Sequence, residues 1–317
     1  MAHIMRQLII TLGLMLSGVC CFNKKDHHGQ SKHAGVTYQV TLDVFSGLED
    51  PKWDIDHTSP FYARIEKAYK SVPSTPLGEH LGYHGFLVKT TETYGQKGSW
   101  TVGPGKNKEL ETMLLKSCCN TLRNEELETS SLQTCGCSLS RVVTDFVTRA
   151  INGIIHHQPR RPHHGPPIVN STACTTRYEP HVWNVRGVIR RNNCYNYGTN
   201  RQTNTFAQPG RASGVRLNTS HINATLVYSL CVRDGLTRLN GPTPGNDCLM
   251  ALVIWPGSDF HFYRLDDNGF WSHKPGRTAV IDTDHSRRRM NDIEAADHGP
   301  YTVFAGYLGV GTNININ

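Results

Sequence analysis

Three residues in the C-terminal half of the sequence have types and spacing that suit nucleophilic chemistry: Cys194, His261 and His273. Either Asn192 or Asn193, just before the cysteine, is a good helix N-cap, so the sequence predicts that Cys194 lies in the first turn of a helix. Free backbone N–H groups and the positive end of the helix dipole stabilise a thiolate at such a position. A thiolate attacks carbonyl carbon, and a histidine can accept the thiol proton.

The two histidines stand on either side of a turn sequence, Leu265–Gly269. A hairpin centred on Asp267 would place His261 directly opposite His273 on one face, and the phenylalanines at 260, 262 and 270 would face a core on the other side. A tighter turn centred on Asn268 and Gly269 would shift the register and separate the histidines. With the first register, His261 can act as the base and His273 can orient it.

Disulfide formation is the competing interpretation of Cys194, because the sequence has 10 cysteines, a high number for a cytosolic protein of this size. Adjacent cysteines cannot readily pair with each other. We therefore predict two disulfide bridges, which join the adjacent pair Cys118 and Cys119 to the pair Cys135 and Cys137.

Several motifs resemble a little-characterised family of secreted proteins. The longest are NCYNYGTNRQTNTFAQPGRASG (193–214), ALVIWPGSDFHFYRLDDNGFWSHKPGRT (251–278) and HGPYTVFAGYLG (298–309), and DVFSG (43–47) and LGYHGFLV (81–88) accompany them. The order of Cys, then His on a strand, then His on the next strand is similar to the NlpC/P60-type branch of papain-like cysteine peptidases. The resemblance implies a papain-like domain in which Cys194 attacks, His261 is base and then acid, and His273 orients it.

This sequence departs from the NlpC/P60 pattern at two points. Asn193 stands where these proteins usually carry Asp directly before the cysteine. The glutamines Gln202 and Gln208 follow Cys194, whereas papain places its oxyanion glutamine before the cysteine. The backbone N–H of Cys194 can supply one oxyanion donor, and the second has no assignment.

Periodicity predicts an α+β protein of two domains. Strand patterns occur at 36–45, 85–90, 99–102, 224–233, 248–255, 259–265, 270–273 and 301–308, and helical spacing occurs at 60–72, 108–118 and 139–155. We predict a signal peptide at 1–21, an N-terminal α+β domain at 22–155, a linker rich in Pro, His and Arg at 156–170, and a papain-like domain at 171–317.

The N-terminus and the cysteine content predict a secreted, extracellular protein with no membrane span in the mature chain. Residues 8–19 form a short apolar stretch after Arg6, which is typical of a signal peptide and short for a membrane span. Glycosylation sequons begin at Asn170, Asn218 and Asn223. The formal net charge of +7 favours anionic surfaces without choosing among them.

The resulting hypothesis is a secreted cysteine hydrolase that cleaves a peptide or amide bond, on cell-wall peptides or another anionic polymer. The sequence has neither a phosphate-binding GxxxxGK[ST] nor a zinc HExxH motif, and we expect no cofactor, no metal and no nucleic-acid partner. Two alternatives stay open: a non-catalytic toxin or recognition module on the same fold, and a transglutaminase-like acyl transferase.

Overall fold

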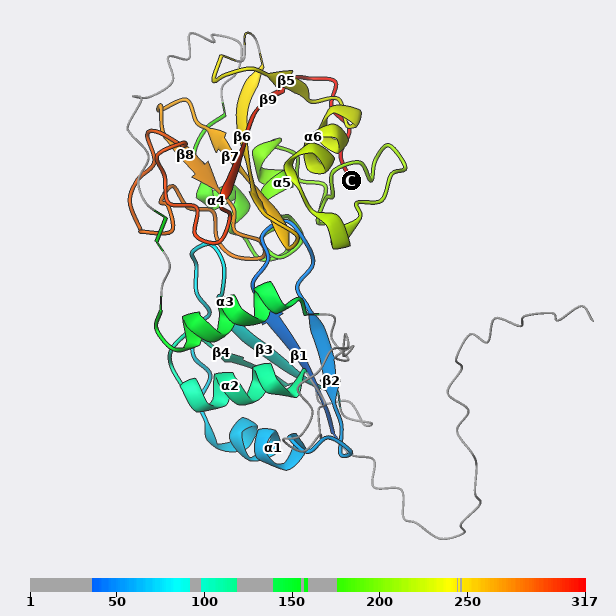
Figure 1. The fold of residues 1–317 in the computed structure, drawn as a ribbon, viewed down its shortest axis with the longest axis vertical. Coiled ribbons are helices and arrows are strands. Elements are labelled where there is room, and N and C mark those ends of the chain that lie inside the picture. The colour runs from blue at the N-terminus through cyan, green and yellow to red at the C-terminus, as the bar shows by residue number, and fades with distance from the viewer. Residues whose placement is uncertain are drawn as a thin grey trace, which may run out of the picture. The chain divides into compact units, whose positions relative to one another are not determined.

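The computed structural model describes residues 36–91, 98–118, 139–154, 157–158, 176–243, 245 and 247–317. The described residues belong to one compact unit, Gly35–Asn317, which contains two antiparallel β-sheets with helices packed on them (Figure 1). The fold class is therefore α+β, as predicted. The predicted signal peptide lies outside the described residues.

The first sheet has the strand order β2-β1-β3-β4, and all of its strand pairs are antiparallel. Its strands are β1 (Thr37–Asp43), β2 (Lys52–Ile55), β3 (Gly85–Thr91) and β4 (Ser99–Val102). Helix α1 (Tyr62–Ser71) follows β2, and α2 (Lys108–Ser117) and α3 (Arg141–Ile151) lie across one face of the sheet (Figure 1). The side chains of Asn107 and Ser140 accept hydrogen bonds at the N-termini of α2 and α3, as N-caps do.

The second sheet has the strand order β5-β9-β6-β7-β8. Its strands are β5 (Thr237–Leu239), β6 (Cys248–Trp255), β7 (Asp259–Leu265), β8 (Trp271–His273) and β9 (Val303–Val310). Strand β6 is an almost continuous apolar run because both of its faces are buried. Its odd-numbered residues from Leu249 pack in the core shared with the first sheet, and its even-numbered residues from Met250 pack in a second core.

The structure corrects the prediction of a strand at 224–233. That segment is helix α6 (Ala224–Arg233), and Asn223 caps it by accepting a hydrogen bond from the Leu226 N–H. The β-branched and aromatic residues suggested a strand, but Val227 and Cys231 are four residues apart and both are buried on one helical face. The shorter helices of this part of the chain are α4 (Pro180–Trp183), α5 (Cys194–Gly198) and the 3₁₀ turn η1 (Thr219–His221).

Most of the predicted linker at 156–170 lies outside the described residues, so the division into two domains stays a prediction. Its described residues are His157 and Gln158. The Nδ1 atom of His157 lies 2.8 Å from a carboxylate oxygen of Asp297, and Gln158 Nε2 donates to the carbonyls of Gly299 and Tyr301. These two residues are therefore bonded to the loop that precedes β9.

A buried carboxylate connects the two sheets. Asp259, at the start of β7, accepts hydrogen bonds from three consecutive backbone N–H groups in the loop after β1: Ser46 (2.7 Å), Gly47 (3.2 Å) and Leu48 (2.9 Å). The Tyr301 hydroxyl donates a fourth, at 2.6 Å. Burial raises the pKa of Asp259 to about 6, and these donors favour the charged form, so the carboxylate is ionised at neutral pH.

We predict that Asp259→Asn lowers the free energy of unfolding by roughly 2–4 kcal/mol, because it removes a charge and turns an NH₂ group toward buried N–H donors. Urea denaturation at pH 7 measures the loss. The matched control is Asp267→Asn, at an exposed position whose ion pair with Arg177 spans 3.5 Å; surface substitutions of this kind change stability by about 0.5 kcal/mol or less. Equal losses in the two variants would contradict the role given to Asp259.

Candidate cysteine–histidine site

Helix α5 begins at Cys194, as the sequence predicted. The Asn193 side-chain oxygen accepts from the N–H groups of Tyr195 (3.1 Å) and Asn196 (3.2 Å). The Asn196 side chain in turn accepts from the Asn193 N–H at 3.1 Å, which completes a capping box. The cysteine is thereby held in the first turn of a short, well-capped helix.

The Cys194 thiol is free of a disulfide and fully buried. Its Sγ atom lies 4.0 Å from the carbonyl oxygen of Phe260, which is its hydrogen-bond partner among the described residues. Burial raises the pKa of this thiol well above its ordinary value, and the Asp259 carboxylate adds to the rise. Both effects outweigh the helix terminus, so the sulfur carries its proton at neutral pH.

The two candidate histidines are in contact, although the predicted register was wrong. The β7–β8 hairpin pairs Tyr263, not His261, with His273. The turn is centred one residue later than predicted, on Asn268, and the Asp266 N–H donates to the Phe270 carbonyl across it. Residues two apart on a strand share a face, so His261 is a diagonal neighbour of His273. Its Nε2 lies 2.8 Å from His273 Nδ1.

The hydrogen bonds determine the tautomers of this pair. His273 Nε2 lies 2.9 Å from the Thr283 carbonyl, which can only accept, so this nitrogen carries a proton. His273 Nδ1 therefore accepts from the Nε2–H of His261. The remaining nitrogen, His261 Nδ1, is an unprotonated, buried acceptor with no hydrogen-bond partner among the described residues. Burial lowers the pKa of His273 to about 3 and that of His261 as well, so both rings are neutral at pH 7.

No hydrogen bond joins the Cys194 thiol to the histidine pair in the described part of the chain. Cys194 packs in the apolar cluster that contains Phe260 and Phe262, whereas the His261 ring packs against Tyr263 and Tyr301. Side chains alternate along a strand, so Phe260 and Phe262, which pack in the same cluster as Cys194, face away from His261. A catalytic role for the three residues stays a prediction.

The loop after β1 covers the start of α5, a contact that sequence reasoning missed. The Gly47 carbonyl accepts from Asn193 Nδ2 at 2.9 Å and from Gln208 Nε2 at 2.8 Å. A Cβ atom at Gly47 would lie 2.4 Å from the Phe260 ring, so only glycine fits there. The DVFSG motif at 43–47 marked this loop in the sequence, but no local pattern indicated that the loop contacts α5.

Lys274, next to His273, is a second residue that sequence reasoning missed. Its side chain is fully buried, and Nζ donates to the carbonyls of Ile189 (2.5 Å), Gly276 (2.6 Å) and Thr278 (3.0 Å). Burial lowers the pKa of this amine to about 7. Three carbonyl acceptors can take all three protons of the ammonium form, so Lys274 joins the segment before α5 to the loop after β8.

The other predicted modification sites divide into described and undescribed residues. Cys118 and Cys248 are disulfide-bonded, and Cys231 is a second free, buried cysteine. Cys119, Cys135 and Cys137 lie outside the described residues, so the predicted pairing stays a prediction. Asn218 and Asn223 are exposed, and Asn170 is not described.

Within the described ranges, no cluster of three or more His, Cys, Asp or Glu side chains has the arrangement of a metal site. The helices of those ranges include none with the length and apolar character needed to cross a membrane.

Comparison with known proteins gives one informative relative. The chain is 57% identical over 144 residues to the "insoluble matrix shell protein 1" of Ruditapes philippinarum, an alignment that covers 45% of this chain and 96% of the relative. No family model matches the chain. No solved structure matches it either.

We predict that Cys194 resists alkylation in the folded protein, because it is buried and its pKa is raised. Iodoacetamide at pH 8, followed by mass mapping without reduction, should leave Cys194 and Cys231 unlabelled before unfolding and label both in urea. Unfolding is the internal control, since it exposes the same thiols. Labelling of Cys194 at pH 6 faster than a free model thiol would instead identify an activated thiolate.

Proposed function

The chain belongs to the family of the insoluble matrix shell protein 1 of Ruditapes philippinarum, and from this premise we propose that it is a structural component of an insoluble extracellular matrix. The protein is secreted and extracellular. The observation that carries the proposal is the high identity over nearly the whole length of the relative. The alignment with this relative covers less than half of this chain, so a matrix role for the rest of the chain is part of what we propose.

We also infer that the second sheet and α5 form a papain-like arrangement of the NlpC/P60 type, used as a scaffold. Two features support this inference. A cysteine-bearing helix precedes an antiparallel sheet and contacts its strand β7, and two histidines lie on that strand and the next. Burial of the thiol, and its hydrogen bond to the Phe260 carbonyl instead of to a histidine, favour a scaffold over a catalyst.

A secreted cysteine hydrolase acting on a peptide or amide bond is the second candidate. The observation that favours it is the unpaired Nδ1 of His261, a lone pair of the kind that a general base needs. A buried, unpaired acceptor costs about 1–3 kcal/mol, which catalysis would justify. For this activity, β7 or α5 would have to rearrange so that Cys194 reaches the histidine.

Fractionation of the extracellular material of the source tissue tests the matrix proposal. We expect the protein to stay in the insoluble residue after successive extraction with salt, a calcium chelator and a non-ionic detergent, because matrix components are held by many contacts at once. A soluble secreted protein of the same tissue is the control. Recovery in the fluid or in the first salt extract would refute the proposal. Amide hydrolysis that Cys194→Ser abolishes would support the second candidate.

A further inference from the structure

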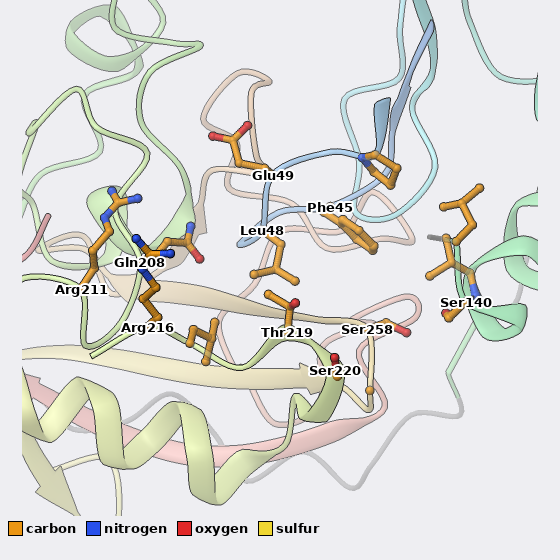
Figure 2. A pocket seen from close by; sticks show the side chains of 15 residues that line it. Phe45, Leu48, Glu49, Ser140, Gln208, Arg211, Arg216, Thr219, Ser220 and Ser258 are labelled. Carbon is orange, nitrogen blue, oxygen red and sulfur yellow. Dashed lines mark hydrogen bonds between the residues drawn. The ribbon is translucent and has the colours of Figure 1, made fainter. Parts of the chain in front are cut away.

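A cavity of about 880 Å³ opens beside the loop after β1, apart from the cysteine–histidine residues (Figure 2). Its volume is within the range of small-ligand pockets, roughly 300–1,000 Å³. The apolar part of its lining is formed by Phe45, Leu48, Leu139, Val143 and Leu217. Figure 2 shows the side chains of Gln208, Arg211 and Arg216 grouped at one end of it.

The segment that supplies these arginines has one sign of charge. Residues 180–233 include no Asp, Glu or Lys. The segment carries the arginines Arg186, Arg190, Arg191, Arg201, Arg211, Arg216 and Arg233. Among the described residues, none of them is in an ion pair. Cations outside ion pairs attract polyanions, and the cavity lies where two of these arginines converge.

The two arginines at the cavity differ in how they are held. Arg211 is anchored: Nε donates to the Asn317 carbonyl at 2.8 Å, and Nη2 donates to the carbonyls of Thr205 (2.8 Å) and Phe206 (3.2 Å). Its Nη1 group has no hydrogen bond to any described residue. Arg216 is exposed and has no hydrogen bond or ion pair in the described part of the chain. One guanidinium is thus fixed in place and the other is free to close on a ligand.

The remaining polar lining suits a hydroxyl-rich ligand. Thr219, Ser220 and Ser258 bring hydroxyl groups, and the Ser258 Oγ is buried with no partner among the described residues. The acidic residue at the rim, Glu49, is compensated by an ion pair with Arg277. None of the lining residues belongs to a strand, so the cavity has no sheet edge to pair with a peptide main chain.

We propose that this cavity binds an acidic polysaccharide, with Arg211 and Arg216 at a carboxylate or sulfate group and the apolar wall against a sugar ring. Guanidinium groups form strong charge-assisted hydrogen bonds with such anions. Hydroxyl and amide side chains satisfy sugar hydroxyls, and the apolar wall excludes water from the ring face. The proposal rests on the proposed matrix function and names the polymer class to which the protein attaches.

Titration calorimetry with the full secreted chain tests the proposal. The probes are a sulfated and a uronate oligosaccharide of defined length, a neutral chitin oligosaccharide and polyglutamate. We expect the acidic oligosaccharides to bind more tightly than the other two, and binding to weaken with salt because exposed charges are screened. The sulfated and uronate arms distinguish the two anion types.

The diagnostic variant is Arg216→Gln, and Arg186→Gln is its matched control, since Arg186 is exposed on the same segment but does not line the cavity. Arg216→Gln should weaken acidic oligosaccharide binding about tenfold, the loss expected for one charge-assisted hydrogen bond. Arg186→Gln, with the same change in net charge, should weaken it less than about twofold, the effect of long-range attraction alone.

Three results would overturn the proposal. Equal weakening by both variants would show diffuse attraction without a site at the cavity. Tighter binding of polyglutamate would indicate an acidic protein partner, and equal binding of the chitin oligosaccharide would remove charge as the determinant. If the protein fractionates with the insoluble matrix but binds neither acidic oligosaccharide, this proposal fails while the matrix function stands.

Discussion

The Asp259 carboxylate is the constraint on which the arrangement of both sheets depends. It comes from the first residue of β7, and its donors are three successive N–H groups after β1 and a tyrosine before β9. A buried carboxylate is stable only when its lone pairs are satisfied, and four donors achieve this. The loop after β1 is therefore held by its backbone, independently of its side chains. The position of Asp259 in the second sheet therefore determines where the loop after β1 of the first sheet lies.

This attachment has two consequences for the surface. The Gly47 carbonyl is turned toward Asn193 and Gln208, which closes the loop over the start of α5 and keeps Cys194 away from solvent. The same loop presents Phe45 and Leu48 to the neighbouring cavity. One set of hydrogen bonds thus buries the candidate nucleophile and builds the apolar wall of a separate binding site.

Local signals in the sequence predicted local structure well. An asparagine N-cap before Cys194, the strands around 248–255 and 259–265, and the helix within 139–155 all follow from residue type and spacing over a few positions. At 224–233 strand propensity predicted the wrong element, and the structure shows a helix that Asn223 caps and that buries side chains four residues apart. An N-cap is the more specific signal, because it satisfies the unpaired N–H groups that occur at the start of a helix and not in a strand.

Long-range relations could not be predicted, because no local pattern encodes them. The hairpin register depends on where the turn is centred. The hydrogen bond from the Asp266 N–H to the Phe270 carbonyl centres it on Asn268. The histidines still meet, since a shift of two positions preserves the face of a strand. The face of β7 on which α5 packs follows from the positions of Phe260 and Phe262, which share a cluster with Cys194, and no pattern within α5 alone determines it.

Whether this fold acts as a catalyst or as a scaffold depends on the hydrogen-bond partners and nearby charges of the cysteine sulfur and the histidine nitrogen. A catalytic pair needs the thiol proton to have a nearby acceptor, so that the thiolate and imidazolium stabilise each other. Here the thiol meets a carbonyl oxygen, and the Asp259 charge raises its pKa further. The nearby anion that joins the two sheets therefore opposes ionisation of Cys194. Stability of the sheet connection and reactivity of the thiol place opposite demands on one carboxylate, and this chain satisfies the first.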